Sequence, residues 1–164
     1  TLEGQTIFLD RPFFVMATEN PVETEGVYQL GAAQLDRFMM KVYTDKLSED
    51  EEMLVAASHE ERAIEVSRVI TKQEVLDVRE FIRVNVSLHE DVRRYGLRLV
   101  RSLRYGGIVS GDDFYFLPEG ERGYLFLERA AKTKAFLGGR LYVTPQDIDE
   151  LALRVLNHRV GLKY

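Results

Sequence analysis

The stretch PFFVMATENPVETEGVYQLGAAQLDRFMMKV, residues 12–42, determines how the rest of the chain is interpreted. It opens with a continuous apolar run, residues 13–17, between Pro12 and the turn-forming pair Asn20-Pro21. A short run without alternation, rich in aromatic and β-branched residues, is typical of a strand buried on both faces. Such strands form parallel α/β sheets, whose ligands bind beyond the carboxyl ends of the strands. The polar residues 18–20 occupy that place here.

The motif ATENPVETEGVYQLGAAQLDRFMMKV, residues 17–42, resembles the sensor-1 to arginine-finger segment of MoxR-family AAA+ ATPases. The family pattern runs A-T-x-N-P-[IV]-E-x-E-G-x-Y-x-L-x-x-A-Q-L-D-R-F, followed by two apolar residues, a basic residue and Val. A second stretch, GGRLYVTPQDI at residues 138–148, together with His158-Arg159, is similar to the end of the family's helical lid. The resemblance covers nearly the whole chain, and it implies a hairpin ahead of the sensor-1 strand, at residues 1–10. The alternative for these residues is a simple surface strand.

Composition places the chain among ordinary globular proteins. Its 164 residues are 45% hydrophobic and 30% charged, enough for one domain or two small ones. The net charge of −5 argues against a nucleic-acid surface along the whole chain, and the absence of cysteine excludes disulfides. No apolar run approaches the roughly 20 residues that a membrane span needs. We therefore expect a cytoplasmic protein.

After residue 42, amphipathic helices replace strand-like runs. The pattern [Ser/Thr]-x-x-[Asp/Glu], in which a hydroxyl and a carboxylate satisfy the first amides of a helix, predicts four helix starts. One predicted helix has an apolar stripe of Leu88, Val92, Tyr95 and Leu99. Another, at about 122–137, ends at a glycine pair whose first member, Gly138, is expected to be left-handed. The four predicted starts are Ser48/Glu51, Thr71/Glu74, Ser87/Glu90 and Thr144/Asp147.

These patterns predict a mainly α fold with a small β portion. Residues 1–43 are expected to be the C-terminal piece of an α/β AAA+ nucleotide-binding core, and residues 44–164 an all-α lid bundle. The aromatic run at residues 114–116 is either a short strand or packed beneath a loop, and we favour packing because adjacent aromatics are rarely left in water. The predicted strand at 13–17 lacks most flanking strands, so residues 1–43 should pair with another copy or depart from the family conformation.

Asn20 is the candidate sensor-1 residue. The resemblance implies that its amide hydrogen-bonds toward the γ-phosphate of ATP and the attacking water. A neutral amide suits this role because it donates to one oxygen while it accepts from another. The alternative is that Asn20 only stabilises the turn before Pro21.

Arg37 is the candidate arginine finger. The resemblance implies a guanidinium offered to the nucleotide of a neighbouring subunit, where it stabilises charge in the transition state. The alternative is an ion pair within the chain, with Asp36 or Glu25.

Arg122 is the candidate sensor-2 residue, which would contact nucleotide phosphate. The family's lid has G-x-S-P-R-A at this point, and the arginine matches in register ahead of Ala-Ala-Lys at 130–132. Gly120-Glu121 replaces the Ser-Pro pair. A carboxylate there would hold Arg122 away from phosphate or repel the phosphate itself.

Two ATPase motifs are absent from the sequence. No G-x-x-x-x-G-K-[ST] loop is present to hold phosphates, and no apolar strand ends in Asp-Glu to hold Mg²⁺. ATP and Mg²⁺ are therefore cofactors expected of a full-length protein, and the 164-residue chain alone is predicted to be inactive. The expected function is the C-terminal part of an ATPase that remodels or matures partner proteins.

The expected partners also follow from the resemblance. It implies a homo-oligomer, a hexamer in the family, that works with von Willebrand factor A domain proteins. The three histidines lack the spacing of metal ligands, so no metal site is predicted. A basic stripe of Arg94, Arg98 and Arg101 is more typical of a solvated helix face than of a nucleic-acid site. The alternative function is a stand-alone helical module that binds protein or nucleic acid without ATPase activity.

Overall fold

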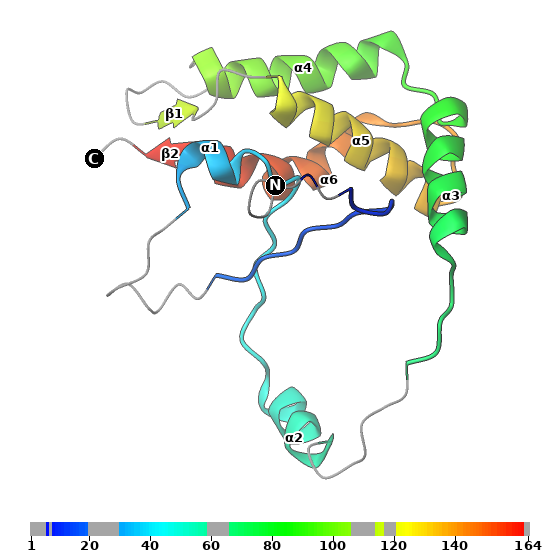
Figure 1. The fold of residues 1–164 in the computed structure, drawn as a ribbon. Coiled ribbons are helices and arrows are strands. Elements are labelled where there is room, and N and C mark those ends of the chain that lie inside the picture. Colours follow the sequence, from blue (N-terminus) through cyan, green and yellow to red (C-terminus); the bar gives the residue numbers. More distant parts are fainter. Residues whose placement is uncertain are drawn as a thin grey trace.

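The computed structural model describes residues 6, 8–19, 30–58, 66–105, 114–116 and 121–162, with only the backbone of 114–116 and 162. Helices dominate these ranges and two short strands accompany them (Figure 1). The predicted class, mainly α with a small β portion, is confirmed. The elements are α1 (Ala32–Leu35), α2 (Glu49–Ser58), α3 (Lys72–Asn85), α4 (Glu90–Tyr105), β1 (Phe114–Phe116), α5 (Arg122–Leu137), α6 (Pro145–Leu156), the 3-10 helix η1 (Asn157–Arg159) and β2 (Val160–Leu162).

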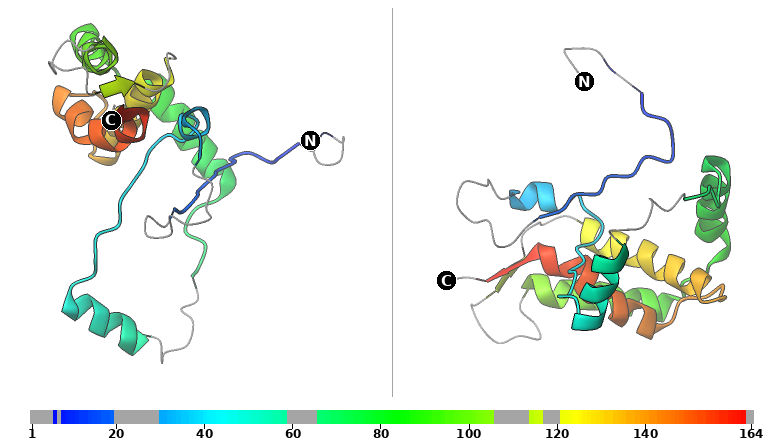
Figure 2. Two further views of the ribbon diagram at one scale, coloured as in Figure 1. Left: turned by 90° about the vertical axis from the view of Figure 1, so that its left-hand side faces the viewer. Right: turned by 90° about the horizontal axis from the view of Figure 1, so that it is seen from below.

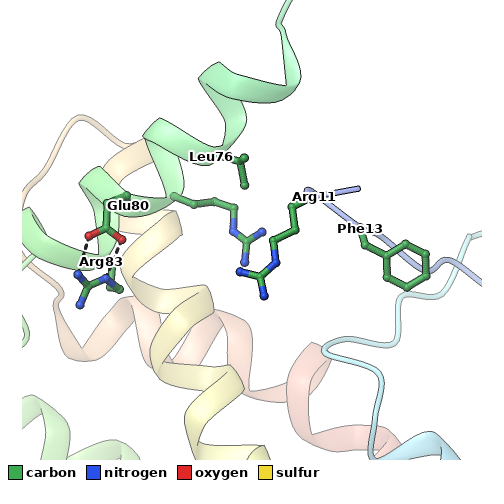
Figure 3. Close-up of a pocket in the computed structure, with 6 residues that line it drawn as sticks. Arg11, Phe13, Leu76, Glu80 and Arg83 are labelled. Atoms are coloured by element: carbon green, nitrogen blue, oxygen red, sulfur yellow. Dashed lines mark hydrogen bonds and ion pairs between the residues drawn. The ribbon is translucent and has the colours of Figure 1, made fainter. Parts of the chain in front are cut away.

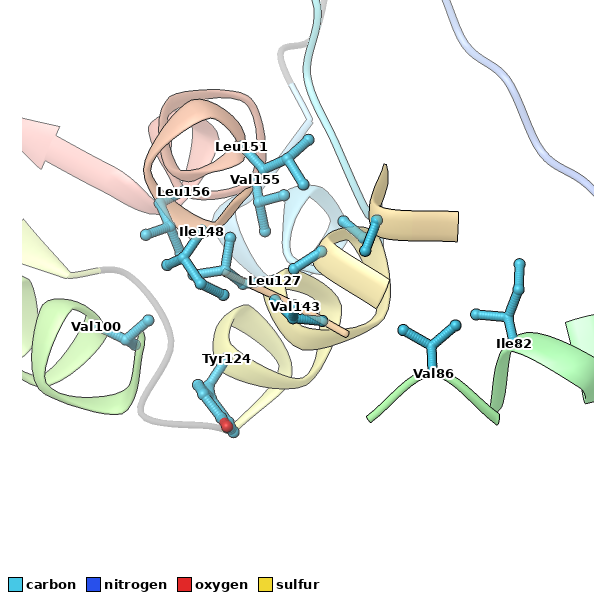
Figure 4. Close-up of a cluster of buried hydrophobic side chains, with 13 residues drawn as sticks. Ile82, Val86, Val100, Tyr124, Leu127, Val143, Ile148, Leu151, Val155 and Leu156 are labelled. Carbon is cyan, nitrogen blue, oxygen red and sulfur yellow. The ribbon is translucent and has the colours of Figure 1, made fainter. Parts of the chain in front are cut away.

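The core lies around α5, which packs against α3, α4 and α6. Small residues on α5, among them Ala130, Ala131 and Ala135, are buried and let the neighbouring helices approach closely. On α4, Gly96 serves the same purpose, because a Cβ there would lie 3.5 Å from the Tyr124 ring. Figure 4 shows the cluster. Its members are Ile82, Val86, Val100, Tyr124, Leu127, Ala130, Ala131, Ala135, Val143, Ile148, Leu151, Val155 and Leu156.

Three of the four predicted helix starts are confirmed. Thr71 precedes α3, and its hydroxyl accepts from the Glu74 amide at 3.2 Å while the Glu74 carboxylate accepts from the Thr71 amide at 2.7 Å. Thr144 begins α6 in the same way, with Asp147 as the acidic partner. Ser48 and Glu51 form the reciprocal pair ahead of α2.

The fourth predicted start is wrong. Helix α4 begins at Glu90, and the amide of Arg93 donates to the carbonyl of His89. Ser87 instead forms a bridge with Tyr142, and its amide and hydroxyl both donate to the carbonyl of Leu141. Its hydroxyl therefore bonds to a segment that is distant in sequence, which the local pattern does not reveal.

The predicted apolar stripe of α4 is correct except at Tyr95. Leu88, Val92 and Leu99 pack against the core. Tyr95 is exposed, and its hydroxyl donates to Asp149 on α6. The phenol therefore links two helices at the surface, and Gly96 next to it occupies the buried position.

The glycine pair after α5 ends the helix, but the second glycine, and not the first, has the left-handed conformation. Gly138 has φ −83°, and Gly139 has φ +72°. The amide of Arg140 donates to the carbonyl of Ala135, and that of Gly139 to Phe136, which is the hydrogen-bond pattern of a Schellman motif. The helix therefore ends at Leu137 as expected, but the left-handed residue is Gly139 and not Gly138.

Residues 114–116 form strand β1, contrary to the packing that the sequence favoured. β1 pairs antiparallel with β2, with Tyr115 opposite Gly161. The backbone hydrogen bonds of this run are satisfied by a strand more than forty residues later. No local pattern indicates that partner.

Helix α2 lies apart from the other helices, and residues 13–17 run as an extended segment outside the helical core (Figures 1 and 2). Residues 13–17 were predicted to form a buried strand, but they pair with no described residue, and Phe14 is 82% exposed. Residues 6 and 8–10 form no strand, and the rest of the predicted hairpin falls outside the described residues. No residue of α2 is buried. This chain therefore supplies no strand, within its described residues, to cover residues 13–17.

Candidate functional site

Asn20 lies outside the described residues, so its predicted role is not addressed by the structure. Its neighbour Glu19 is described, and the Glu19 carboxylate accepts from Lys41 Nζ at 3.2 Å. This bond connects the end of the extended segment to the residues that follow the candidate finger.

The segment around Arg37 begins with the single turn of α1. The side chain of Gln34 accepts from the amide of Gly31 at 3.0 Å and so closes the start of the turn. After α1, the amide of Arg37 donates to the carbonyl of Gln34 at 3.1 Å. The backbone at Arg37 is therefore fixed by a local turn.

Asp36 is a buried carboxylate shared by two arginines. It is 3% exposed, and its Oδ1 accepts from Nε of Arg159 at 3.0 Å. Its Oδ2 accepts from Nη1 of Arg122 at 2.9 Å. A buried carboxylate needs such partners, because an unpaired charge away from water costs several kcal/mol.

Arg159 ties the backbone on both sides of Arg37. It is fully buried, and its Nη2 donates to the carbonyls of Asp36 at 2.9 Å and Phe38 at 2.7 Å. Its Nη1 donates to the carbonyl of Val155, on α6. Burial lowers the pKa of Arg159, and the Asp36 carboxylate opposes this shift. A residue at the end of the lid therefore holds the segment that carries the candidate finger.

His158 adds a further contact to the same segment. Its Nε2 lies 3.0 Å from the carbonyl of Phe38. Burial, and then the positive charge of Arg159, lower the pKa of His158 below its ordinary value. The neutral imidazole is therefore favoured in the folded protein. His158 and Arg159 are buried in η1, directly after α6, and both reach residues 36–38.

The side chain of Arg37 is exposed and bonds to no other described residue. The alternative of an ion pair with Asp36 does not hold, because that carboxylate is occupied by Arg122 and Arg159. Glu25, the other proposed partner, lies outside the described residues. The guanidinium of Arg37 is therefore presented from a fixed backbone.

Arg122 is the first residue of α5, and its side chain is 56% exposed. A carboxylate does hold Arg122, but it belongs to Asp36 and not to the adjacent Glu121. From the sequence, Asp36 was considered only as a partner of Arg37, and Arg159 was not linked to the candidate finger. These residues are 86 and 123 positions from their partners, and no local pattern signals such a contact.

Arg140 and Asp147 form a second ion pair that holds the start of α6. Two guanidinium nitrogens of Arg140 donate to the carboxylate at 2.7 and 2.8 Å, and Thr144 also donates to it. These bonds lower the pKa of Asp147 to about 2. Asp147 thus acts as the predicted partner of Thr144, and Arg140 neutralises its charge.

A basic pocket of about 390 Å³ lies between the N-terminal segment and α3 (Figure 3). Its lining includes neither Arg37 nor Arg122. One of its guanidinium groups, that of Arg83, is bonded to Glu80 on the same helix. The lining residues are Arg11, Phe13, Leu76, Arg79, Glu80 and Arg83.

The described ranges contain no group of three or more metal-ligating side chains, and none of their helices has the length and apolarity of a membrane span. On α4, Arg94 bonds to Glu90 one turn earlier, which is typical of a solvated helix face. Of the three candidate site residues, the structure describes Arg37 and Arg122, and both carry exposed guanidiniums of a kind that can bind an anion such as nucleotide phosphate.

Comparisons with known proteins agree with this arrangement. Residues 1–40 match the model of the ATPase family associated with various cellular activities, and residues 116–163 match the AAA lid domain. The uncharacterized protein YeaC of Bacillus subtilis is 38% identical over 99% of the chain and 49% of its own length. Chaperone MoxR1 of Mycobacterium tuberculosis is 32% identical over 100% of the chain and 44% of its own length.

A solved structure shows the same fold. It is the crystal structure of a candidate ATPase from Cytophaga hutchinsonii, with a TM-score of 0.88 and 37% identity over 100% of this chain and 51% of that one. This chain thus spans about half the length of the proteins it matches. The matched motifs, the curated relatives and the shared fold show that the chain belongs to the MoxR family of AAA+ ATPases.

Proposed function

We propose that this chain is the part of a MoxR-type ATPase that responds to the γ-phosphate and completes the catalytic site of a neighbouring subunit. Arg37 is its arginine finger, Asn20 its sensor-1 amide, and Arg122 a lid residue directed at phosphate. The oligomer, a hexamer in the family, uses ATP hydrolysis to remodel or mature partner proteins. Von Willebrand factor A domain proteins are the partner class that the family resemblance indicates, and a cytoplasmic location remains an expectation.

The observation that favours this function best is that the backbone on both sides of Arg37 is held by hydrogen bonds. Arg159 bonds to the carbonyls of Asp36 and Phe38, the residues on either side, while the Arg37 side chain stays exposed. A charged group on a fixed backbone loses little freedom when it meets a developing charge, and preorganisation of this kind is the main protein contribution to phosphoryl transfer. An arginine used only for solubility has no need of such support.

The proposed roles leave phosphate binding and Mg²⁺ to another stretch of polypeptide. The sequence contains no phosphate-binding loop, and the described residues contain no cluster of metal ligands. When bound, Mg²⁺ would neutralise negative charge on the phosphates. The residues of this chain would then act on the γ-phosphate, with Arg37 stabilising its negative charge and Asn20 positioning water. The isolated 164-residue chain is expected to be inactive.

The test of the finger is Arg37→Ala in the full-length protein. We expect ATP turnover to fall by about 10³-fold or more, because an arginine finger contributes on that order, while the Kd of nucleotide changes little. Turnover and nucleotide binding are measured on the assembled oligomer. Arg94→Ala, which removes an exposed arginine paired to Glu90, is the matched control and should leave turnover unchanged.

Mixed oligomers test whether the finger acts between subunits. Asn20→Ala subunits keep the finger and lose the amide, whereas Arg37→Ala subunits keep the amide and lose the finger. Each variant alone should be inactive, and a mixture should regain turnover at interfaces that combine the intact Asn20 with the intact Arg37. A mixture as inactive as its components would exclude a finger that acts in trans.

A further inference from the structure

The ion pair between Asp36 and Arg122 joins two groups that the proposed function assigns to different nucleotides. Asp36 precedes the finger, which serves a neighbouring subunit, whereas Arg122 begins α5 of the lid. The bond is 2.9 Å long and connects residues 86 positions apart. A change at one of these groups therefore reaches the other directly.

The charges of the cluster do not balance. One carboxylate, Asp36, faces two guanidiniums, those of Arg122 and Arg159. The Asp36 side chain is 4% exposed and that of Arg159 0%, while that of Arg122 is 56% exposed. The excess positive charge is thus available to solvent at Arg122. An anion such as phosphate would be favoured there, because charge-assisted hydrogen bonds to a guanidinium are strong.

The bond between Arg122 and Asp36 can also break without leaving the buried Asp36 carboxylate unpaired. If Arg122 moves away, Asp36 keeps its bond to Nε of Arg159, which in turn keeps the two carbonyls beside Arg37. If Arg159 were lost, the buried carboxylate would keep only an exposed partner. Arg159 is thus the permanent partner of Asp36, and Arg122 is the exchangeable one.

We propose that Asp36 is a positioning residue that binds Arg122 while the subunit's own nucleotide site is empty and releases it to nucleotide phosphate when that site fills. Nucleotide binding then removes one of the two guanidiniums that hold Asp36, next to the finger. Occupancy of one site is thereby transmitted to the residue that serves the next site. This inference rests on the proposed function, because it takes the anion to be a nucleotide.

A double-mutant cycle on the full-length ATPase tests the exchange. The Kd of a non-hydrolysable ATP analogue is measured for wild type, Arg122→Ala, Asp36→Asn and the double variant. Arg122→Ala should weaken binding by about tenfold, since it removes a charge-assisted contact with phosphate. Asp36→Asn should tighten binding by about two- to fivefold, because Arg122 no longer has to leave a carboxylate. In the Arg122→Ala background, Asp36→Asn should have no effect.

The matched control is Arg93→Ala. Arg93 is also about half exposed and pairs across helices, with Glu128 of α5 at 3.4 Å. Unlike Arg122, it forms no bond to Asp36. Its loss should leave the Kd unchanged. If Asp36→Asn weakens binding, or changes it equally with and without Arg122, Asp36 is only structural and the exchange is wrong.

A second measurement needs no change at Asp36, whose variant leaves Arg159 buried and unpaired. Hydrogen exchange at the amides of residues 36–38 is compared with and without the analogue. In wild type, nucleotide should speed exchange there modestly, because Asp36 loses one of its two guanidiniums while Arg159 keeps its bonds. In Arg122→Ala, exchange should already be at the faster rate and should not respond. Equal responses in both proteins would overturn the inference. Failure of the full-length protein to bind nucleotide, or full turnover of Arg37→Ala, would instead overturn the proposed function.

Discussion

The bonds of Asp36 show what a buried charge requires in this protein. Arg159 and Asp36 are both almost fully removed from water, and each remaining polar atom of the pair is directed at a carbonyl or a guanidinium. Removing one member of a buried pair typically costs about 3–5 kcal/mol, because the other charge is left unpaired. The sequence supplied Asp36, Arg122 and Arg159 as separate motif residues. Only the fold brings them together, since their spacing follows no helical or strand period.

Asp147 gives a pH-dependent prediction at the same scale. Its pKa falls from 3.8 to about 2, chiefly through hydrogen bonds from Arg140. The ionised form therefore stabilises the fold above the ordinary pKa, and this stabilisation is lost as pH falls from about 4 toward 2. We expect Asp147→Asn to lower the free energy of unfolding by about 2 kcal/mol at pH 7. Denaturation at pH 7 and pH 2 checks this, and the difference between wild type and variant should nearly vanish at the lower pH.

At the scale of elements, the sequence predicted the helix starts that depend on contacts between residues close in sequence. The caps at Thr71 and Thr144 were predictable because donor and acceptor lie three residues apart. The start of α4 was not, because Ser87 bonds to Leu141 across 54 residues. Strand β1 was missed for the same reason, as its partner β2 lies at the far end of the chain.

The end of α5 tests the role of a left-handed residue. Gly139 has φ +72°, and a Cβ there would meet nothing within 4 Å, so any cost of Gly139→Ala comes from the backbone and not from packing. We expect a loss of about 1 kcal/mol of stability. Gly138→Ala is the matched control at φ −83° and should cost clearly less. Thermal denaturation compares the two; equal losses would show that the left-handed conformation is not what favours glycine.

At the scale of the whole molecule, the chain combines a packed lid with a segment that has no cover of its own. Phe14 and Met16 are 82% and 80% exposed, and residues 13–17 lack a strand partner among the described residues. The sequence predicted both the apolar run and its need for other strands. It did not predict the exposure, because an apolar run does not show whether strands are available to cover it. The division into units at residue 43 stays a prediction.

Hydrogen exchange tests that need for other strands. In a full-length ATPase, the amides of residues 13–17 should gain strand partners and exchange slowly, because backbone groups in a central strand are hydrogen-bonded on both edges. In the 164-residue chain, the same amides should exchange rapidly. The amides of α5, buried in the lid in both cases, serve as the internal reference. Fast exchange at 13–17 in both proteins would contradict the predicted strand.

The bonds of Arg159 also predict which substitutions a random library of this chain would reveal as inactive. Its guanidinium supports a segment more than 120 residues earlier. A random-mutagenesis screen for loss of ATP turnover should therefore recover substitutions at Arg159. Those substitutions would resemble changes in the active site, although Arg159 itself is buried and is not expected to contact ATP.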